Sequence, residues 1–510
     1  MIKLSFIKAV LLAAMIMGFA TGQASGQLLH PKFEFRGVWV ATVNNIDWPS
    51  QPGLPVETQK KEVISMLNLH KSLGMNAIVL QVRPCSDTFY PSPLEPWSRY
   101  LTGIPGKPPE PFWDPLRFWI DECHLRGMEL HAWLNPYRIA QHANEPLAYD
   151  HKIFSKPEWA IIYGDKIYFD PGIPGTRDYV TSVVCDIVRR YDVDGIHMDD
   201  YFYPYPTKDP FPDEGSFKRF SRAFPAEEKE AWRRENVDIL IKMISDSIRA
   251  INPHVKFGIS PFGVWRNLTD DPSGSATKAG ITNYDHLYAD IRKWLKEGWI
   301  DYVVPQIYWE IGHKLADFKT LCEWWNANSF GRNLYIGLAP YKIDSKATVD
   351  AWRKKDQLPD QLELLRKYPN ISGCVFFSSR SFTKNLLGFQ DSLKNRLFKH
   401  ASLTPPLASS QTNLPDPPTN VSVSGRKVRW EGPIAGSTGA RPYSYLIYLN
   451  QPNELFDPGN SLKIVGYTLE PQAELQKKRE RKKKNWSLRV TTLDRDHRES
   501  LPSTPASIRY

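Results

Sequence analysis

The sequence predicts an α/β protein: a (β/α)8 TIM barrel followed by a small C-terminal all-β domain. From Glu34 to about Lys399, short apolar runs rich in β-branched and aromatic residues alternate with longer amphipathic stretches, which is typical of parallel strands joined by helices. Eight such pairs follow one another, and this number fits a closed barrel better than an open sheet. With 510 residues, the chain can hold a barrel of about 250 to 400 residues and one further domain.

Residues 1–27 predict a secretory signal peptide. Lys3 and Lys8 precede an apolar run from Ala9 to about Ala20, and small residues follow it. The run is shorter than the roughly 20 residues that span a bilayer, and no later apolar stretch is longer. The first cysteine is Cys85, so no lipobox cysteine follows the apolar run. We expect an exported protein, periplasmic or extracellular, without a transmembrane segment.

Residues 28–400 contain the eight repeats of the barrel. The expected strands are 34–43, 76–84, 129–138, 194–203, 255–264, 301–310, 333–342 and 372–380. The expected helices are 57–73, 114–127, 176–191, 227–251, 283–298, 315–328, 357–368 and 386–398. Asp114 before Pro115 predicts an N-cap, and Gly127 and Gly298 stand where helices end. Long loops after strands two to five, at 86–113, 139–175, 203–225 and 265–282, are expected to shape a substrate groove on one rim.

A change of composition after His400 predicts a second domain. Residues 401–416 are rich in proline and serine, which indicates a linker. Residues 417–510 then alternate in short strand-like runs. The opening PPTNVSVSG and the later runs YLIYLN and LRVTTLD resemble fibronectin type III domains, which are β-sandwiches. The resemblance implies a spacing or packing role, with weak polymer contact as the alternative.

Charge and cysteine content exclude several classes of function. The net charge of +9 falls to +7 when the leader removes two lysines, and much of the surplus lies in the run 477–484 (KKRERKKK). We interpret this run as a solvated loop, with affinity for an acidic polymer as the alternative. No nucleic-acid partner is expected, because no binding motif is recognisable. Five scattered cysteines without CxxC spacing indicate neither a disulfide scaffold nor a metal site, and no cofactor is expected.

Candidate catalytic residues follow from the alternation of side chains along the barrel strands. Inward-pointing residues at the C-terminal ends of the strands form the floor of a barrel active site. In strand four, Ile196 and Met198 are apolar and face the helices. The inward residues are therefore His197, Asp199 and Tyr201 in this strand, and Gln306, Tyr308 and Glu310 in strand six.

Two carboxyl groups that flank a sugar linkage can cleave it by acid and base catalysis. Asp199 and Glu310 combine inward direction with a strand-end position. We therefore expect Asp199 to be the nucleophile or the stabiliser of an oxocarbenium ion, and Glu310 to be the general acid/base. Asp200 is the competitor, because a register error of one residue exchanges the directions of neighbouring side chains. A turn that binds backbone amides is the structural alternative for this acidic pair.

Polar and aromatic side chains at the same strand ends are expected to bind the sugar. Arg83 and His197 would orient the carboxylates or donate to hydroxyl groups, although a packed core position is an equal alternative for His197. Sugar rings stack on aromatic faces, and we expect removal of Trp265 mainly to weaken binding. The expected substrate-binding residues are Trp39, Arg83, Asn135, Tyr137, His197, Tyr201, Tyr203, Trp265, Gln306 and Tyr308.

Six motifs resemble the glycosyl hydrolase-like 10 family. They are FRGVWVATVNNIDWP (35–49), LQVRP (80–84), HAWLNPYR (131–138), DGIHMDDYFYP (194–204), SPFGVWRN (260–267) and PQIYW (305–309). The resemblance covers about residues 33–399 and implies a barrel glycosidase that cleaves O-glycosidic bonds in a polysaccharide. Characterised members act on bacterial cell-wall glycan, including strands stripped of their peptides, so the implied partner is peptidoglycan or a related polysaccharide. Strand four also resembles α-amylase-type barrels, but His197 stands where those barrels carry an arginine.

Two other functions are alternatives to a glycosidase with two carboxyl groups. A metal-dependent barrel hydrolase would need paired histidines at the end of strand one, which reads RGVWVATV. A non-catalytic carbohydrate-binding barrel of the cell envelope would use its acids only to bind hydroxyl groups. Replacement of Asp199 distinguishes the glycosidase from the binding barrel, because it should lower the kcat of a glycosidase by orders of magnitude with little effect on folding.

Overall fold

The computed structural model describes residues 30–407, 414–433, 443–476 and 484–509. The expected signal peptide, part of the expected linker and the basic run apart from Lys484 lie outside the described residues. The chain divides into two compact units. One comprises Phe35–Asp391 and Leu407–Ser410, and the other comprises the segment ending at Glu34 together with Ser392–Pro406 and Gln411–Tyr510.

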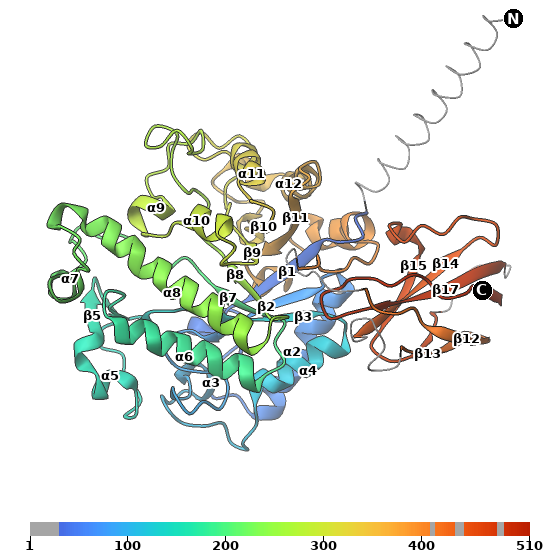
Figure 1. Cartoon of the computed structure of the whole chain (residues 1–510), viewed down its shortest axis with the longest axis horizontal. Helices are drawn as coiled ribbons and strands as arrows, with labels where there is room; N and C mark the ends of the chain where they lie inside the picture. Colours follow the sequence, from blue (N-terminus) through green and yellow to red (C-terminus); the bar gives the residue numbers. More distant parts are fainter. Residues whose placement is uncertain (1–29, 408–413, 434–442, 477–483, 510) are drawn as a thin grey trace, which may run out of the picture. The chain divides into compact units, whose positions relative to one another are not determined.

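Eight parallel strands of the first unit close into a barrel (Figure 1). Each pairs with the next barrel strand along the chain, and the last pairs with the first. The strands are β1 (Phe35–Val40), β2 (Ala77–Arg83), β3 (Glu129–Leu134), β7 (Gly195–Met198), β8 (Lys256–Ile259), β9 (Tyr302–Val303), β10 (Asn333–Leu338) and β11 (Ile371–Phe376). The predicted (β/α)8 barrel is therefore confirmed.

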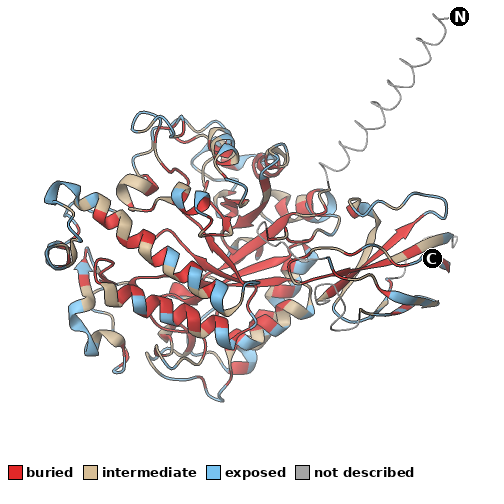
Figure 2. Cartoon of the chain, in the orientation of Figure 1, coloured by how far each residue is buried: buried red, intermediate tan, exposed pale blue. Residues whose placement is uncertain are grey.

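Helices follow the barrel strands and turn one face toward them, and Figure 2 shows the buried strands inside helices that are exposed on their outer side. Asp114 caps α4 by accepting a hydrogen bond of 3.1 Å from the backbone N–H of Arg117, as the sequence predicted. Gly127 and Gly298 have φ angles of 61° and 67°, which glycine adopts without strain at a helix end. The longer helices are α2 (Val56–Ser72), α4 (Pro115–Leu125), α6 (Pro174–Arg190), α8 (Lys229–Ile251), α11 (Phe318–Ala327) and α12 (Gln357–Leu365). The shorter ones are α3 (Arg99–Thr102), α5 (Lys152–Ser155), α7 (Glu214–Phe220), α9 (Asn283–His286), α10 (Ile291–Lys296) and α13 (Phe389–Ser392).

Several barrel strands end earlier than the sequence predicted. The expected strand 301–310 is reduced to β9, since Pro305 cannot donate a hydrogen bond to a neighbouring strand. The expected strand 129–138 divides at Pro136 into β3 and β4 (Arg138–Ala140). Strand β4 instead pairs with β6 (Lys166–Phe169), which pairs with β5 (Ala160–Tyr163) in a separate antiparallel sheet. The chain thereby gains rim loops where longer strands were expected.

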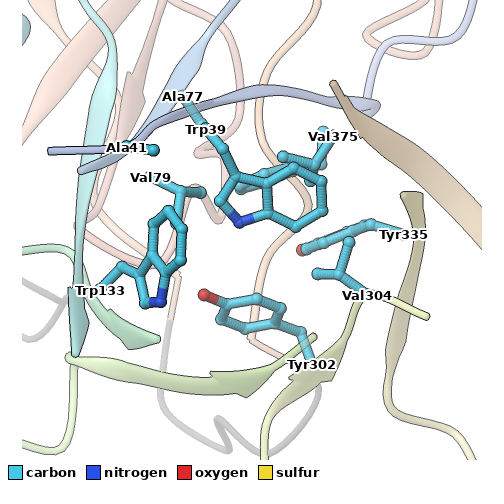
Figure 3. Close-up of a cluster of buried hydrophobic side chains, with 10 residues drawn as sticks. Trp39, Ala41, Ala77, Val79, Trp133, Tyr302, Val304, Tyr335 and Val375 are labelled. Atoms are coloured by element: carbon cyan, nitrogen blue, oxygen red, sulfur yellow. The ribbon is translucent and has the colours of Figure 1, made fainter. Parts of the chain in front are cut away.

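Large aromatic side chains fill the barrel (Figure 3). Phe35 stacks on Tyr335 with ring centroids 4.2 Å apart. Tyr302 lies over Gly258, where an added Cβ would come within 2.0 Å of its ring. Burial of such side chains contributes about 1.5 to 3 kcal/mol each. The interior below the strand ends is therefore packed and gives the rim a rigid floor.

The described residues of the second unit beyond 414 form two antiparallel sheets. One sheet has the order β12 (Thr419–Ser424), β13 (Lys427–Glu431), β16 (Gln472–Glu474). The other has the order β15 (Ile464–Thr468), β14 (Ser444–Asn450), β17 (Asn485–Leu493), β18 (Ala506–Arg509). Their apolar core includes Val428, Ile447 and Val490. The predicted all-β character of this part is confirmed.

All five cysteines are buried and have free thiols. Across the described ranges, none of the helices combines the length and the apolar character needed to cross a membrane.

Candidate active site

A cavity of about 340 Å³ lies at the C-terminal end of the barrel. All eight barrel strands contribute to its lining, through their last residues or the loops that follow them. A volume of this size is typical of a small-molecule or oligomer subsite. The lining includes six of the predicted site residues: Trp39, Asp199, Asp200, Tyr201, Gln306 and Tyr308.

Asp199 is held by donors to both of its carboxylate oxygens. Its Oδ2 accepts hydrogen bonds from Trp133 Nε1 at 3.2 Å and Asn135 Nδ2 at 3.1 Å, and its Oδ1 accepts from Asn135 Nδ2 at 3.3 Å and from the backbone N–H of Tyr201 at 3.4 Å. Burial raises the pKa of Asp199, whereas the nearby charge of Arg138 and these hydrogen bonds oppose the rise. The carboxylate is thus fixed in position, and its donors offset part of the cost of burying its charge.

Asp200 lies beside Asp199 and also has a raised pKa. It accepts a hydrogen bond from the Tyr205 hydroxyl. Burial, and then the negative charge of Asp199, raises the pKa of Asp200 to about 7. Both side chains reach the cavity because β7 ends at Met198, so the alternation of a strand no longer separates them. A carboxyl group with this pKa can donate a proton near neutral pH.

Two basic side chains lie on the walls of the same cavity. Arg138, the first residue of β4, has its guanidinium 4.9 Å from the centre of the Tyr201 ring. Lys166, the first residue of β6, also lines the cavity. The small β4–β6–β5 sheet therefore brings positive charge to a site whose floor holds two carboxyl groups.

A chain of hydrogen bonds runs through the barrel below the cavity. The Trp39 indole N–H can only donate, and it lies 3.3 Å from His197 Nε2, so this nitrogen accepts. His197 therefore donates from Nδ1 to the Tyr302 hydroxyl at 3.0 Å, and that hydroxyl donates to His131 Nδ1 at 2.7 Å. His131 Nε2 then donates to Glu129 at 2.9 Å. Burial lowers the pKa of His197 well below its usual value, which agrees with a neutral ring at this position.

His197 is fully buried and lies beneath the cavity, outside its lining. Its Nε2 also accepts from Ser260 Oγ at 2.9 Å. Trp39 and Ser260 both line the cavity, so His197 orients two lining side chains without facing a ligand itself.

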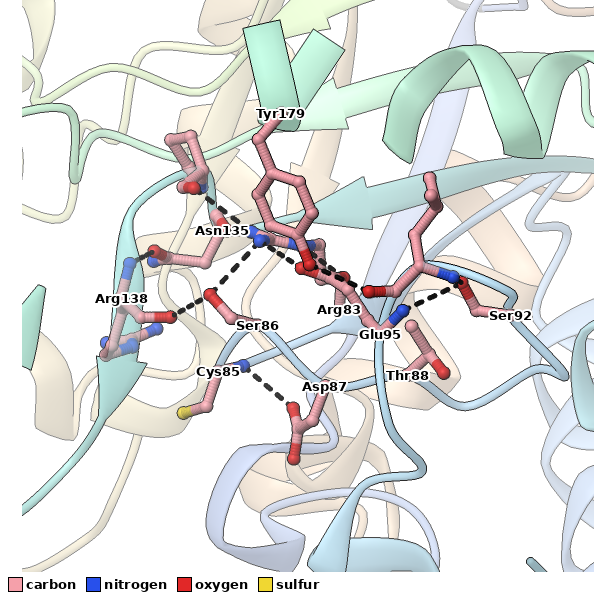
Figure 4. A network of polar contacts seen from close by, with 12 residues as sticks. Arg83, Cys85, Ser86, Asp87, Thr88, Ser92, Glu95, Asn135, Arg138 and Tyr179 are labelled. Carbon is pink, nitrogen blue, oxygen red and sulfur yellow. Dashed lines mark hydrogen bonds and ion pairs between the residues drawn. The ribbon is translucent and has the colours of Figure 1, made fainter. Parts of the chain in front are cut away.

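Arg83 is also buried away from the cavity lining (Figure 4). Its Nε and Nη2 donate to the two carboxylate oxygens of Glu95 at 2.7 and 2.5 Å. Its Nη1 donates to the backbone carbonyls of Asn135 and Pro136. The expected contact of Arg83 with the sugar is corrected, because the Glu95 carboxylate neutralises the charge of Arg83. Arg83 instead holds the backbone of Asn135, the residue that donates to Asp199.

Glu310 does not line the cavity. Strand β9 ends at Val303, so the alternation that predicted an inward direction does not continue to position 310. The half-buried side chain accepts a hydrogen bond from Trp352 Nε1 at 3.2 Å. The expected pairing of Asp199 with Glu310 across the cavity is therefore corrected. Among the described lining residues, the carboxylates are Asp199 and Asp200.

Three predicted binding residues are packed in the surrounding loops. Tyr137 and Tyr203 are each 1% exposed, and the Tyr203 hydroxyl accepts a hydrogen bond from Asn236 Nδ2 at 3.3 Å. Trp265 is 4% exposed and stacks on Trp324 with ring centroids 5.9 Å apart. Because none of the three lines the cavity, their expected contact with substrate is corrected to a packing role.

Other lining residues were not among the predicted site residues. Gln81 shares the inward direction that selected Arg83, and its Oε1 accepts from the backbone N–H of Val43 at 2.9 Å, which fixes the loop after β1. Lys166, Tyr341 and Phe377 come from a hairpin and from loops. Strand alternation could have pointed to Gln81, whereas these three residues carry no sequence signal.

No group of three or more His, Cys, Asp or Glu side chains in the described part of the chain is arranged to hold a metal ion. The side chains of the cavity instead suit a polar organic ligand with apolar faces, since carboxylates and amides alternate with aromatic rings.

The chain is similar to a protein family and to several known proteins. The model of the glycosyl hydrolase-like 10 family matches residues 34–354. The chain is 44% identical over 400 residues to glycosyl hydrolase YngK of Bacillus subtilis, covering 77% of this chain and 78% of that protein. It is 37% identical over 381 residues to glycosyl hydrolase DigH of Escherichia coli K12, covering 70% of this chain and 84% of that protein. The glycoside hydrolase domain of PgaB (BpsB) from Bordetella bronchiseptica has a TM-score of 0.44 at 12% identity, covering 71% of this chain and 98% of that one.

Proposed function

The chain belongs to the glycosyl hydrolase-like 10 family and is a glycoside hydrolase, and from this premise we propose that it is an exported enzyme that cleaves the glycan strands of peptidoglycan. Asp199 and Asp200 carry the reaction in this proposal, at the cavity where all eight barrel strands end. The observation that carries the proposal is the pair itself: two buried carboxyl groups, one of them with a pKa raised to about 7, on the wall of a cavity lined with aromatic rings.

The two acids have different roles. Asp200, whose pKa of about 7 keeps it largely protonated below neutral pH, donates its proton to the oxygen of the leaving sugar. Asp199, held by Trp133 and Asn135, stays anionic and stabilises the positive charge that develops at the anomeric carbon. Asp200 thus takes the role that the sequence assigned to Glu310.

Substrate binding follows the chemistry of the cavity walls. Trp39, Tyr201 and Tyr308 offer ring faces to the CH groups of a sugar, and Gln306 offers an amide to its hydroxyl groups. Asn135 acts on the substrate through Asp199, and Arg83 and His197 act through the residues that they hold.

Cell-wall glycan as the substrate is supported by the family resemblance and by the charge of the cavity. Arg138 and Lys166 can pair with carboxylate groups along an acidic glycan. The leader at 1–27 supports export to the compartment where peptidoglycan lies.

The C-terminal unit is proposed to be a fibronectin type III-like module that spaces or packs the enzyme. Its three- and four-stranded antiparallel sheets, with the strand orders β12-β13-β16 and β15-β14-β17-β18 in the described residues, agree with that β-sandwich architecture.

Hydrolysis is tested by incubating the full-length mature protein with intact and with peptide-stripped cell-wall glycan. The products are identified by mass spectrometry. We expect soluble fragments from the stripped strands, and a loss of about 100-fold or more in kcat for Asp199→Asn and Asp200→Asn. Asp209→Asn changes an exposed carboxylate and serves as the matched control. Full turnover by Asp199→Asn would instead remove Asp199 from the reaction, and an absence of products from the parent protein would mean that the barrel only binds carbohydrate through these acids.

A further inference from the structure

The two cavity carboxylates come from one strand end, and this limits the mechanism. Asp199 and Asp200 are consecutive, so both approach the cavity from the end of β7. A glycosidase with two independent carboxyl groups places them on either side of the scissile bond. The other described lining residues include Trp39, Gln306 and Tyr308, and no further carboxylate.

We propose that the nucleophile is supplied by the substrate: the acetamido group at C2 of the sugar attacks its own anomeric carbon, Asp199 orients that group, and Asp200 is the acid and base. The inference rests on the proposed glycosidase function and deepens it, since it restricts the cleaved sugar to a 2-acetamido-2-deoxy residue. Participation of a neighbouring acetamido group is an established route for some glycoside hydrolases.

Asp199 is suited to orient an amide. Its Oδ2 accepts from Trp133 and Asn135, and its Oδ1 accepts from Asn135 Nδ2 at 3.3 Å and from the Tyr201 backbone N–H at 3.4 Å. Both contacts on Oδ1 are longer than an ordinary hydrogen bond, so a substrate N–H can bind this oxygen more closely than they do. An amide N–H that donates there is polarised, and its carbonyl oxygen becomes a better nucleophile. The carboxylate cannot rotate away, because its donors come from two strand ends.

The surrounding side chains suit the rest of the acetamido group. The indole N–H groups of Trp133 and Trp39 are both donated, to Asp199 and His197 respectively. Both rings line the cavity, and the small part of each that is exposed, 2% for Trp39 and 6% for Trp133, is aromatic surface that a ligand can contact. An acetamido methyl group is apolar and packs favourably on such a face.

The reaction balances without a cofactor. In the first step the acetamido carbonyl oxygen forms a bond to C1 and the bond from C1 to the leaving oxygen breaks. That oxygen keeps the electron pair and takes the proton of Asp200, which leaves an oxazolinium ion whose N–H donates to Asp199. In the second step Asp200 takes a proton from water, the water oxygen bonds to C1, and the bond between C1 and the carbonyl oxygen breaks. One water is consumed, the acetamide is restored and the anomeric configuration is retained.

The first test varies the acyl group on one glycan. Stripped cell-wall strands are N-deacetylated and divided, and the two halves are re-acylated with acetyl or trifluoroacetyl groups. Fluorine withdraws electrons from the carbonyl oxygen, so we expect the trifluoroacetyl strands to be cleaved about 100-fold more slowly or worse, while they still compete for binding. Equal cleavage of both halves would overturn the inference and leave the hydrolase intact. If the re-acetylated strands are not cleaved either, the proposed function itself fails.

A second test uses azide with an aryl 2-acetamido glycoside. Asp200→Ala removes the base of the second step, so azide should trap the oxazolinium ion and give a glycosyl azide of retained configuration. If Asp199 were a covalent nucleophile, Asp199→Ala with azide would give the inverted azide. We expect no inverted product from either variant. Thermal unfolding of both proteins beside Asp209→Asn confirms that each is folded, and inverted azide from Asp199→Ala would refute the assignment.

Discussion

Asp200 should set the alkaline limb of the pH profile. Its pKa is raised to about 7, and a general acid must hold its proton, so kcat/KM should fall about tenfold per pH unit above that value. The groups that face it are Asp199, Tyr205 and Gln306. The Tyr205 hydroxyl stabilises the anion, so Tyr205→Phe should move the alkaline limb to higher pH. The measurement is kcat/KM from pH 5 to 9 for both proteins, and a limb that stays or moves down would contradict the assignment.

Replacement of Trp265 should lower stability, whereas replacement of Tyr341 should weaken substrate binding. Trp265 is 4% exposed and stacked, whereas Tyr341 is 50% exposed and lines the cavity. We expect Trp265→Ala to lower the free energy of unfolding by about 3 to 5 kcal/mol with little change in KM. Tyr341→Ala should raise KM about 2- to 10-fold, the worth of one stacked ring, with an unchanged urea midpoint. Urea unfolding and KM measured on both variants check this, and a raised KM for Trp265→Ala would restore its predicted binding role.

At the scale of the elements, strand alternation predicted side-chain direction only as far as the strands extend. It selected Gln306 and Tyr308, which line the cavity, and it failed at Glu310. The reason is physical, because alternation requires a paired backbone. Strand β9 ends at Val303, but Gln306 still bridges to Phe262 and Gly337, so alternation holds near Gln306 and is lost by Glu310. The same limit brings Asp199 and Asp200 to one cavity although neighbours in a strand diverge.

Partners from distant loops could not be predicted either. The β2–β3 pairing shifts register between Gln81 and Arg83, and Arg83 pairs with Glu95 from the following loop instead of lining the cavity. Nothing in the spacing of the two residues distinguishes an ion pair from a free arginine. Lys166 reaches the cavity only because the β5–β6 hairpin folds against β4, which is a tertiary event.

The ion pair of Arg83 and Glu95 should stabilise the ends of β2 and β3 and tune catalysis through them. Glu95→Gln leaves a buried guanidinium without its counter-charge, and we expect a loss of about 3 to 5 kcal/mol in the free energy of unfolding. The double variant Arg83→Met/Glu95→Leu should regain most of that loss, because it removes both buried charges. Its kcat should stay low with KM nearly unchanged, since Asn135 loses the donor on its carbonyl. Full recovery of kcat would show that the pair serves packing alone.

At the scale of the whole molecule, the repeat of eight units was enough to predict the barrel. A closed sheet needs only that each apolar strand be followed by an amphipathic helix, and this pattern is local in the sequence. The C-terminal sheets were likewise predicted from local alternation. Stability, by contrast, depends on buried ionisable groups spread over the molecule, and these follow from the packed structure alone.

Two sets of buried groups should make stability change little between pH 8 and 5.5. In the folded protein, burial raises the pKa of Asp47, Asp87 and Asp170 to about 6 and of Asp200 to about 7. The folded state then holds protons that the unfolded chain has released, so these groups favour folding as the pH falls through 7 to 4. Burial lowers the pKa of His70 to about 3, of His151 to about 4 and of His197 further. The unfolded chain protonates these histidines below about pH 6.5, so they oppose folding over the same interval.

Single substitutions should unbalance the two sets in opposite directions. His70→Gln removes a group that only the unfolded chain protonates at pH 5.5. The free energy of unfolding at pH 5.5 minus that at pH 8 should therefore be about 1 kcal/mol larger in the variant than in the parent. Asp170→Asn removes a proton that only the folded state holds at pH 5.5, so the same difference should fall by about 1 kcal/mol. Urea unfolding at the two pH values, at one ionic strength, measures each difference within one variant, so a uniform packing loss cancels. If this difference changes with the same sign in both variants, the buried carboxyl groups and histidines do not have the shifted pKa values that their burial implies.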